Sequence, residues 1–397
     1  MAFPNDVVIL GGCGHVGLPL GLAFACRGLR VELFDTNADI VDAVNAGRMP
    51  FREAGADLAL TTVLREGRLS ATTDPASIAR AENVVVVVGT PVDRHLSPDI
   101  EAVPRALSPV VSRLGDGQLL VLRSTVYPGV TALVERLLAA SECTLDVCFC
   151  PERIAEGHAL EELHHLPQIV AARTPRAFDR AAALFGRLTD HLVQLSPEEA
   201  ELAKLFTNSW RYLKFAAANQ LFMIANDSGL DFERIRSAIT YLYPRAADMP
   251  GPGFCAGPCL FKDTMQIAAF SENTFTLGHA SMMINEGLPL YAIGRIEQRY
   301  DLGTMTVGIL GMAFKAGSDD TRESLSYKLK RALRVKARDV LCTDPHVTSD
   351  PDLLPLDEVL ARADLLIVAT PHVEYAGLEP GVPTVDLFNL LGHGVAI

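Results

Sequence analysis

The chain has 397 residues, of which 49% are hydrophobic and 21% charged, a balance typical of a soluble globular enzyme and not of a disordered or fibrous protein. A net charge of −13 makes nucleic acid and anionic membranes unfavourable partners, and we expect neither. The eight cysteines have neither the density of a disulfide scaffold nor the spacing of a metal-binding knuckle, so we expect reduced thiols and assign no metal.

Short β-branched, strand-like runs alternate with helical stretches in the first half of the chain. They lie at residues 7–10, 31–34, 84–88 and 119–122, and each is followed by a turn and a periodic segment. A continuous apolar run such as 84–88 is typical of a strand in a parallel sheet that is covered by helices on both faces. The sequence therefore predicts a doubly wound α/β domain over residues 1–195.

A helical middle follows. Ser196-Pro197-Glu198-Glu199 combines an N-cap serine, a proline in the first turn and a glutamate at the third helical position, which predicts the start of a long helix ending near residue 228. Residues 196–300 contain no strand-like run as clear as those before them, and a loop rich in proline and glycine lies at 244–258. We interpret 196–300 as a central helical dimerisation and catalytic domain.

The alternating pattern returns in the last quarter. Strand-like segments at 307–311, 339–343, 365–369 and 384–387 are separated by helical pieces. They predict a second, smaller doubly wound domain over residues 301–397. The apolar stretch near the start of the chain is broken by glycines and lacks a basic leader, and no other run approaches the roughly 20 apolar residues of a membrane span, so we expect a cytoplasmic protein.

A dinucleotide-binding fingerprint lies directly after the first predicted strand. In Gly12-Cys13-Gly14-His15-Val16-Gly17, the first glycine makes a tight turn, the second lets backbone amides approach a pyrophosphate, and the third lets helix and strand pack closely. Asp35 ends the second strand, where a carboxylate accepts ribose hydroxyls and repels a 2′-phosphate. The sequence therefore predicts a Rossmann-like domain that binds NAD through Gly12, Gly14, Val16, Gly17 and Asp35.

Cys259 is a candidate nucleophile. It precedes Lys262 and Asp263 at a predicted helix start, and a nearby cation and helix N-terminus both favour the reactive thiolate. The alternative is a small buried side chain, which is the commoner role of cysteine in such a chain.

Two further pairs carry groups that catalysis uses. Lys204 and Asn208 lie four residues apart on the long helix and could stabilise an oxyanion together, although a solvated helix face is the alternative. Glu152 and Glu156 would share a face of a helical turn and could act as acid and base, but paired acids near a helix start are common.

Taken together, these motifs resemble the UDP-glucose/GDP-mannose dehydrogenase family, in the family's order and over essentially the whole chain. The resemblance implies a four-electron oxidation of the C6 hydroxymethyl of a nucleotide sugar to a uronic acid, with two NAD molecules, for polysaccharide or glycosylated natural-product synthesis. It also implies a thiohemiacetal and then a thioester on Cys259. The motifs are the glycine fingerprint, Gly89 to Asp93, Ser124 to Gly129, Pro151 to Gly157, Lys204 with Asn208, Cys259 to Asp263, and Gly311 to Lys315 with Asp319 to Ser324.

The resemblance assigns catalytic roles. Lys204 and Asn208 would stabilise the oxyanions at C6 and contact the substrate. Asp263 would position or deprotonate a water with Lys204. Glu156 would be the base for thioester hydrolysis and would also touch the nicotinamide side of NAD, while Glu152 would line the sugar pocket.

The resemblance also assigns binding roles. Arg245 would reach the substrate of the neighbouring subunit, which implies a homodimer or a higher homo-oligomer. The other cofactor-binding positions are Thr90, Thr125, Lys262 and Arg322, and the other substrate-binding position is Lys315.

The sequence leaves the sugar open. Pro151-Glu152-Arg153 resembles the branch that acts on UDP-N-acetylhexosamines, whereas Cys259-Leu260-Phe261-Lys262-Asp263 resembles the UDP-glucose branch. The loop before Cys259 has fewer glycines than the family pattern, and Phe388-Asn389 replaces an arginine often found there. Two other functions stay open: a two-electron β-hydroxyacid dehydrogenase, which needs no thiol, and an NAD-binding sensor without activity.

Overall fold

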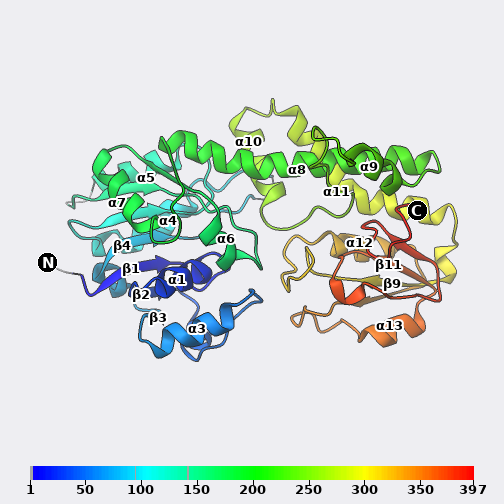
Figure 1. The fold of residues 1–397 in the computed structure, drawn as a ribbon, viewed down its shortest axis with the longest axis horizontal. Coiled ribbons are helices and arrows are strands. Elements are labelled where there is room, and N and C mark those ends of the chain that lie inside the picture. Colours follow the sequence, from blue (N-terminus) through cyan, green and yellow to red (C-terminus); the bar gives the residue numbers. More distant parts are fainter. Residues whose placement is uncertain (1–2, 94, 141–142) are drawn as a thin grey trace. The chain divides into compact units, whose positions relative to one another are not determined.

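The computed structural model (Figure 1) describes residues 3–93, 95–140 and 143–397. Its packing divides the chain into two units, residues 1–207 and residues 208–397. Among the described residues, none of the helices combines the length and the apolar character that crossing a membrane requires.

The first unit is built on an eight-stranded sheet with the order β3-β2-β1-β4-β5-β6-β7-β8. Neighbouring strands are parallel except β6 and β7, which are antiparallel. The strands are β1 (Asn5–Leu10), β2 (Val31–Phe34), β3 (Leu69–Thr72), β4 (Ala81–Val86), β5 (Leu119–Leu122), β6 (Asp146–Phe149), β7 (Gln168–Ala172) and β8 (Leu192–Leu195).

Helices cover both faces of this sheet. On β1, Val7 and Ile9 belong to one apolar cluster, and Val8 and Leu10 belong to another, because successive side chains of a strand point to opposite faces. Both faces are therefore buried, and the predicted doubly wound fold is confirmed. The helices are α1 (Gly17–Cys26), α2 (Ala38–Asn45), α3 (Ala56–Arg65), α4 (Ala102–Leu107), α5 (Val130–Ala139), α6 (Ala159–His165) and α7 (Pro175–Phe185), with 3₁₀ turns η1 (Pro75–Arg80) and η2 (Ser108–Arg113).

The predicted long helix is α8 (Pro197–Asp227). Its start has the predicted capping arrangement: the backbone N–H of Glu199 donates to Ser196 Oγ over 3.3 Å, and the Glu199 carboxylate accepts from the Ser196 backbone over 2.8 Å. This reciprocal capping satisfies amides that a helix start otherwise leaves without partners. Its last residues, from Asn208 onward, belong to the second unit.

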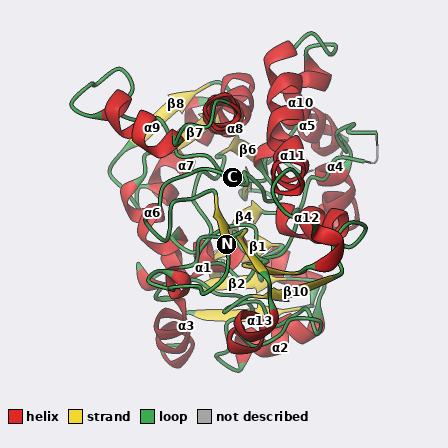
Figure 2. Cartoon of the chain, turned by 90° about the vertical axis from the view of Figure 1, so that its right-hand side faces the viewer, coloured by secondary structure: helices red, strands yellow, loops and turns green. Residues whose placement is uncertain are grey.

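The second unit combines helices with a smaller sheet. Helices dominate residues 197–297 (red in Figure 2). The four strands that follow are parallel, in the order β10-β9-β11-β12, as the last quarter of the sequence predicts. The elements are α9 (Phe232–Thr240), α10 (Leu260–Phe270), α11 (Thr276–Glu297), η3 (Leu302–Thr304), β9 (Thr306–Leu310), α12 (Leu325–Leu333), β10 (Asp339–Thr343), α13 (Leu356–Arg362), β11 (Leu365–Val368), η4 (Val373–Tyr375) and β12 (Thr384–Asp386).

Candidate active site

The glycine turn between β1 and α1 has the shape that a pyrophosphate needs. A Cβ on Gly12 would lie 2.8 Å from Leu33 Cβ, and one on Gly17 would lie 2.4 Å from the Gly11 carbonyl oxygen, so packing requires glycine at both positions. The nearest atom to a Cβ on Gly14 would be the Gly11 carbonyl oxygen, 3.8 Å away. The protein therefore leaves space at Gly14, beside the start of α1, which fits the close approach of a phosphate group.

Asp35 stands beside this turn at the carboxyl end of β2. Its carboxylate accepts hydrogen bonds from the backbone amides of Cys13 and Asn37, each over 3.1 Å, and the residue is partly exposed. Two amides fix the carboxylate while part of it stays accessible, which is the arrangement that accepts ribose hydroxyls. Burial and then the nearby Asp35 charge raise the pKa of the Cys13 thiol to about 12, so this thiol stays protonated.

The loops that follow β4 and β5 are tied together. Thr90 Oγ1 donates a hydrogen bond to the backbone oxygen of Thr125, and Ser124 Oγ accepts from the backbone N–H of Val88 over 2.7 Å. The structure thus brings Thr90 and Thr125 into direct contact at the carboxyl edge of the sheet, where open α/β sheets bind ligands. Their contact with the cofactor stays a prediction.

The two glutamates of loop 151–157 have different surroundings. Glu152 is buried; one oxygen binds the guanidinium of the fully buried Arg123, and the other accepts from two backbone amides of the same loop over 2.6 and 3.0 Å. Glu156 lies 3.6 Å from Nδ1 of His15 in the glycine turn. Glu152 therefore holds the loop and Glu156 faces the turn, while the role of Glu152 toward the sugar stays a prediction.

Sequence reasoning missed Arg123. The side chain also donates to the backbone oxygen of Cys150 and to the side-chain oxygen of Gln168, over 3.0 and 3.1 Å. A signal was available, because an arginine directly after a fully apolar strand rarely stays buried without a carboxylate partner. Its partner Glu152 lies on a different strand end, which the local sequence does not reveal.

In the second unit, Cys259 is exposed and occupies the N-cap of α10. One turn later Asp263 is fully buried; it accepts a 2.6 Å hydrogen bond from Asn208 Nδ2 and forms a 2.7 Å ion pair with Lys262. The structure thus brings Asn208, Lys262 and Asp263 together one helical turn from the thiol. Lys204 is also buried, on the part of α8 that belongs to the first unit.

Five of the other cysteine thiols, including Cys13, have a pKa above its ordinary value. Burial raises the pKa of Cys255, four residues before Cys259, to about 12, and that of Cys342 to about 11. Burial also raises the pKa of Cys148 and of Cys26. Exposure at a helix start distinguishes Cys259 from its neighbour Cys255, in line with its predicted role as nucleophile.

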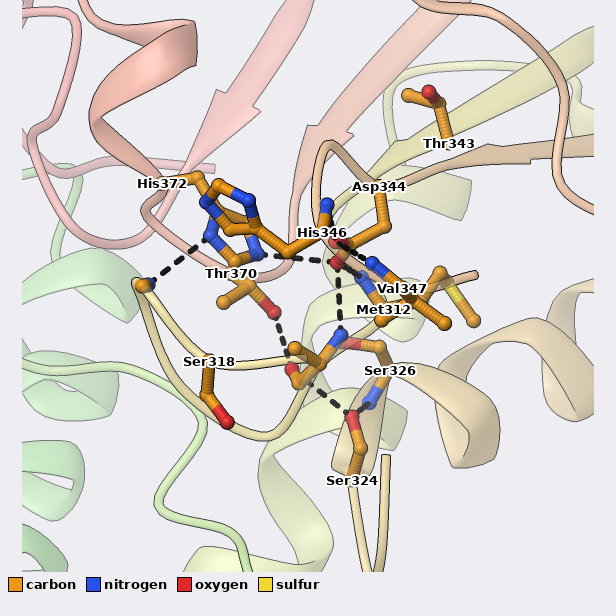
Figure 3. Close-up of polar contacts among 12 residues, drawn as sticks. Met312, Ser318, Ser324, Ser326, Thr343, Asp344, His346, Val347, Thr370 and His372 are labelled. Atoms are coloured by element: carbon orange, nitrogen blue, oxygen red, sulfur yellow. Dashed lines mark hydrogen bonds and ion pairs between the residues drawn. The ribbon is translucent and has the colours of Figure 1, made fainter. Parts of the chain in front are cut away.

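Asp344 organises the glycine turn of the second sheet (Figure 3). Its side chain is fully buried and accepts from the backbone amides of Met312 and Ala313 over 2.6 and 2.9 Å, and from His372 Nε2 over 3.1 Å. Two more amides, of His346 and Val347, donate to its second oxygen. Burial disfavours the charged form, but these hydrogen bonds and the His372 ring outweigh it and hold the pKa of Asp344 well below its ordinary value.

The same cluster contains potential metal ligands. Ligand atoms of His346, His372 and Glu374 lie within 4.8 Å of one another. However, His372 Nδ1 already accepts from the backbone N–H of Gly317 over 3.2 Å, and its Nε2 faces Asp344. Both ring nitrogens of His372 are therefore engaged, and we assign no metal to this group.

The remaining predicted binding residues lie in loops. Arg322 is exposed, and its guanidinium is held by the Asp320 carboxylate over 2.8 and 2.9 Å. Lys315 is partly buried on the loop after β9, and Arg245 is exposed in the loop between α9 and α10. The pair with Asp320 fixes the direction of Arg322 without covering it.

Comparison with known proteins decides the family. The NAD binding domain of the UDP-glucose/GDP-mannose dehydrogenase family matches residues 6–189, its central domain matches 198–286, and its UDP binding domain matches 308–392. The chain belongs to this family. It is therefore an NAD-dependent nucleotide-sugar dehydrogenase, and NAD is its cofactor.

Individual relatives span several sugars. The chain is 31% identical to a UDP-glucose 6-dehydrogenase of Haloferax volcanii, over 93% of this chain and 92% of that protein. It is 29% identical to a UDP-N-acetyl-D-mannosamine dehydrogenase of Pyrococcus horikoshii, over 93% and 90%. The structure of a UDP-glucose dehydrogenase from Pyrobaculum islandicum superimposes with a TM-score of 0.91 at 30% identity, covering 99% of this chain and 96% of that one.

The likeness of this chain to a β-hydroxyacid dehydrogenase is one of fold alone. A 3-hydroxyisobutyrate dehydrogenase of Mycobacterium tuberculosis matches with a TM-score of 0.52 at 17% identity, over 74% of this chain and 94% of that one.

Proposed function

We propose that the protein oxidises the C6 hydroxymethyl of a UDP-sugar to a carboxylate in two steps, through a thioester on Cys259. The observation that carries the proposal is the exposed Cys259 at the start of α10, one turn from a buried Asp263 that Asn208 and Lys262 hold. An NAD enzyme that performed only the alcohol-to-aldehyde step would not need a nucleophilic thiol at its site. The product is a nucleotide uronic acid for the synthesis of a polysaccharide or a glycosylated natural product.

The thiol accounts for the second oxidation. NAD, when bound, would supply the hydride acceptor for both oxidations. Between them, the Cys259 thiolate adds to the aldehyde carbon, forming a C–S bond, and the carbonyl oxygen takes a proton to give a thiohemiacetal. Loss of a hydride and a proton converts it to a thioester, and attack by water breaks the C–S bond, releasing the carboxylate and the thiolate. Covalent attachment keeps the aldehyde from escaping between the two oxidations.

The neighbouring residues stabilise charge and move protons. Lys204 and Asn208 would stabilise the oxyanion that forms at C6, because buried and fixed donors are more effective there than water. Asn208 already points its amide nitrogen at Asp263. Asp263 would order the attacking water together with Lys204, and Glu156 would accept its proton during hydrolysis.

The family resemblance assigns the binding roles. Thr90, Thr125, Glu156, Lys262 and Arg322 would contact NAD, together with the glycine turn. Lys315 and Glu152 would contact the nucleotide sugar. Relatives named for UDP-glucose and for UDP-N-acetyl-D-mannosamine support a sugar of the UDP-glucose or UDP-N-acetylhexosamine type.

We also propose a homodimer that forms through the central helices. On α8, Trp210, Leu221 and Ile224 are 61%, 43% and 57% exposed, and their spacing places them on one helix face. Aromatic and aliphatic side chains at such exposure are typical of interface cores. A dimer would also let Arg245, which is exposed in its own chain, reach the substrate of the other subunit.

The stoichiometry of the reaction tests the proposed function. We expect two NADH per nucleotide sugar, measured by ultraviolet absorbance with UDP-glucose and UDP-N-acetylhexosamines as substrates, and a uronic acid product by mass spectrometry. Cys259→Ser should bind both ligands but lose net acid formation, whereas Cys255→Ser should keep it. One NADH per sugar, or unchanged acid formation by Cys259→Ser, would contradict the thioester route.

A further inference from the structure

Two buried asparagines lie three turns apart on the same face of α8. Asn208 and Asn219 are 6% and 0% exposed, and their separation of eleven residues is close to three turns of 3.6 residues. This face is opposite to the one that carries Trp210, Leu221 and Ile224. One side of the helix is therefore apolar and exposed, and the other presents two amides to the interior.

Asn219 binds the loop that precedes Cys259. Its Oδ1 accepts from the backbone N–H of Gly253 over 2.9 Å, and its Nδ2 donates to the backbone oxygen of the same residue over 3.1 Å. Nδ2 also donates to Asn285 Oδ1 over 2.9 Å, and Asn285 in turn donates to the backbone oxygen of Tyr212 over 3.1 Å. Asn219 thus holds both polar backbone groups of one residue, and Asn285 of α11 fixes the orientation of its amide.

Both the backbone conformation and the surroundings of Gly253 require glycine. Its φ of 146° lies in a region that L side chains rarely adopt. A Cβ there would lie 2.2 Å from the ring of Phe388. The loop is therefore held at this point between an amide pair and an aromatic ring.

The segment 253–263 is attached to α8 at both ends. Asn219 binds Gly253 at its start, and Asn208 binds Asp263 at its end. Cys259 lies between the two attachments, on the irregular stretch just before α10. Both anchors project from one helix, so the two ends of this segment are held at a fixed separation. This restricts how far the Cys259 thiol can move.

We propose that Asn219 is a positioning residue that sets the location of the Cys259 thiol for attack on the aldehyde. The proposal rests on the proposed function in taking Cys259 as the nucleophile. Misplacement of a reacting atom by about 1 Å can reduce a rate on the order of 100-fold. We expect that releasing the anchor at Gly253 lets the thiol shift by about this distance. Asp263 would keep its contacts with Asn208 and Lys262.

The test compares two variants of the same helix. Asn219→Leu removes both contacts with Gly253. Asn226→Leu is the control, because Asn226 is similarly buried and binds Tyr291 and the backbone of Ile397 over 2.9 and 2.7 Å, away from the Cys259 loop. Asn219→Asp keeps an acceptor for the Gly253 amide and loses the donors.

Three readouts distinguish positioning from a general loss of stability. We expect Asn219→Leu to lower kcat at least 30-fold and to slow alkylation of Cys259 by iodoacetamide at least tenfold, with the KM for NAD within twofold of wild type. Alkylation is followed by peptide mass spectrometry, with the exposed Cys26 as an internal reference. Asn219→Asp should fall between Asn219→Leu and wild type, and Asn226→Leu should match wild type in all three readouts.

The possible outcomes separate this proposal from the one it rests on. Equal kcat and equal alkylation rates in Asn219→Leu and Asn226→Leu would overturn the positioning role of Asn219. If Asn219→Leu does not fold, wild-type kcat and alkylation rates in Asn219→Asp would overturn it. If Cys259→Ser keeps net oxidation, the thioester route fails. Alkylation of Cys259 still reports whether Asn219 positions the thiol in that case, because it does not depend on turnover.

Discussion

The two sheets use the same strand–turn–helix plan for different ends. After β1, residues 11–16 lead directly into α1, and Asp35 at the end of the next strand accepts two amides and stays partly exposed. After β9, the much longer stretch 311–324 precedes α12, and the corresponding Asp344 is buried and accepts from four amides and a histidine. Asp35 therefore stays partly exposed, whereas the Asp344 carboxylate is fully occupied by hydrogen bonds within the protein.

This difference explains how one architecture serves two ligands. A carboxylate whose acceptor positions are all filled cannot accept ribose hydroxyls, so the turn after β9 does not repeat the dinucleotide site. Asp344 instead fixes the base of a loop that carries Lys315 and Arg322, the residues predicted to reach the ligands. We infer that the first acid recognises a ligand and the second supports a loop.

The largest effect is expected from removing the charge of Asp344. Asp344→Asn places an NH₂ group where donors already point, and we expect the free energy of unfolding of the second unit to fall by about 3 kcal/mol. Denaturant unfolding measures this. Asp352→Asn is the control, because that side chain is 69% exposed. An equal loss of unfolding free energy in both variants would contradict a stabilising role of the buried Asp344 hydrogen bonds.

The pH dependence of the same variant is the second prediction. The pKa of Asp344 in the folded protein is lower than its unfolded value of about 3.9. The Asp344 carboxylate therefore stabilises the folded state fully above about pH 3.9, and this stabilisation is lost as the pH falls through the folded pKa. The stability gap between wild type and Asp344→Asn should therefore be constant from pH 7 to about 5 and narrow below about 4. A gap that widened in acid would contradict the assigned direction.

Substitution at Gly14, in the turn between β1 and α1, should change the affinity for NAD and leave stability nearly unchanged. Gly14→Ala adds a Cβ where the protein leaves space, and we expect the KM for NAD to rise about tenfold with little change in stability. Gly17→Ala is the contrast, because its Cβ would overlap the Gly11 carbonyl, and it should destabilise the first unit by about 2 kcal/mol. Steady-state kinetics and thermal unfolding of both variants check the pair; similar unfolding temperatures would be unexpected.

The smallest effect is expected at Asp35. Asp35→Asn keeps acceptor capacity beside the turn but removes the negative charge that repels a 2′-phosphate. We expect the preference for NAD over NADP to fall about fivefold, with stability unchanged within about 0.5 kcal/mol. The ratio of kcat/KM for the two cofactors measures it, and a ratio equal to that of wild type would remove Asp35 from cofactor selection.

The sequence predicts the fold where a single strong pattern is present. Strands β1, β2, β4 and β5, each of which contains a run rich in Val, Ile or Leu, follow from their residues alone, and so does the capped start of α8. Strands β3, β6, β7 and β8 were not predicted individually, because polar residues interrupt most of them and β8 is partly exposed. The antiparallel pairing of β7 depends on its neighbours in the sheet and has no local signal.

The site shows the same limit. The glycine turn and the proximity of Asn208 to the Cys259 segment follow from motifs and from the family resemblance. The contacts of Arg123 with Glu152 and of Asn219 with Gly253 join residues 29 and 34 positions apart, and no spacing rule connects them. Such contacts become visible only when the chain is folded, because each partner alone looks like an ordinary polar residue.

The close approach of Gly253 to Phe388 has a consequence for protein engineering. The ring of Phe388 also packs edge-on against Phe254, with 6.5 Å between ring centroids. A transplanted nucleophile loop that carried a side chain at position 253 would collide with this ring. Chimeras that exchange the loop and position 388 together should be recovered as folded protein, whereas single-segment exchanges should not.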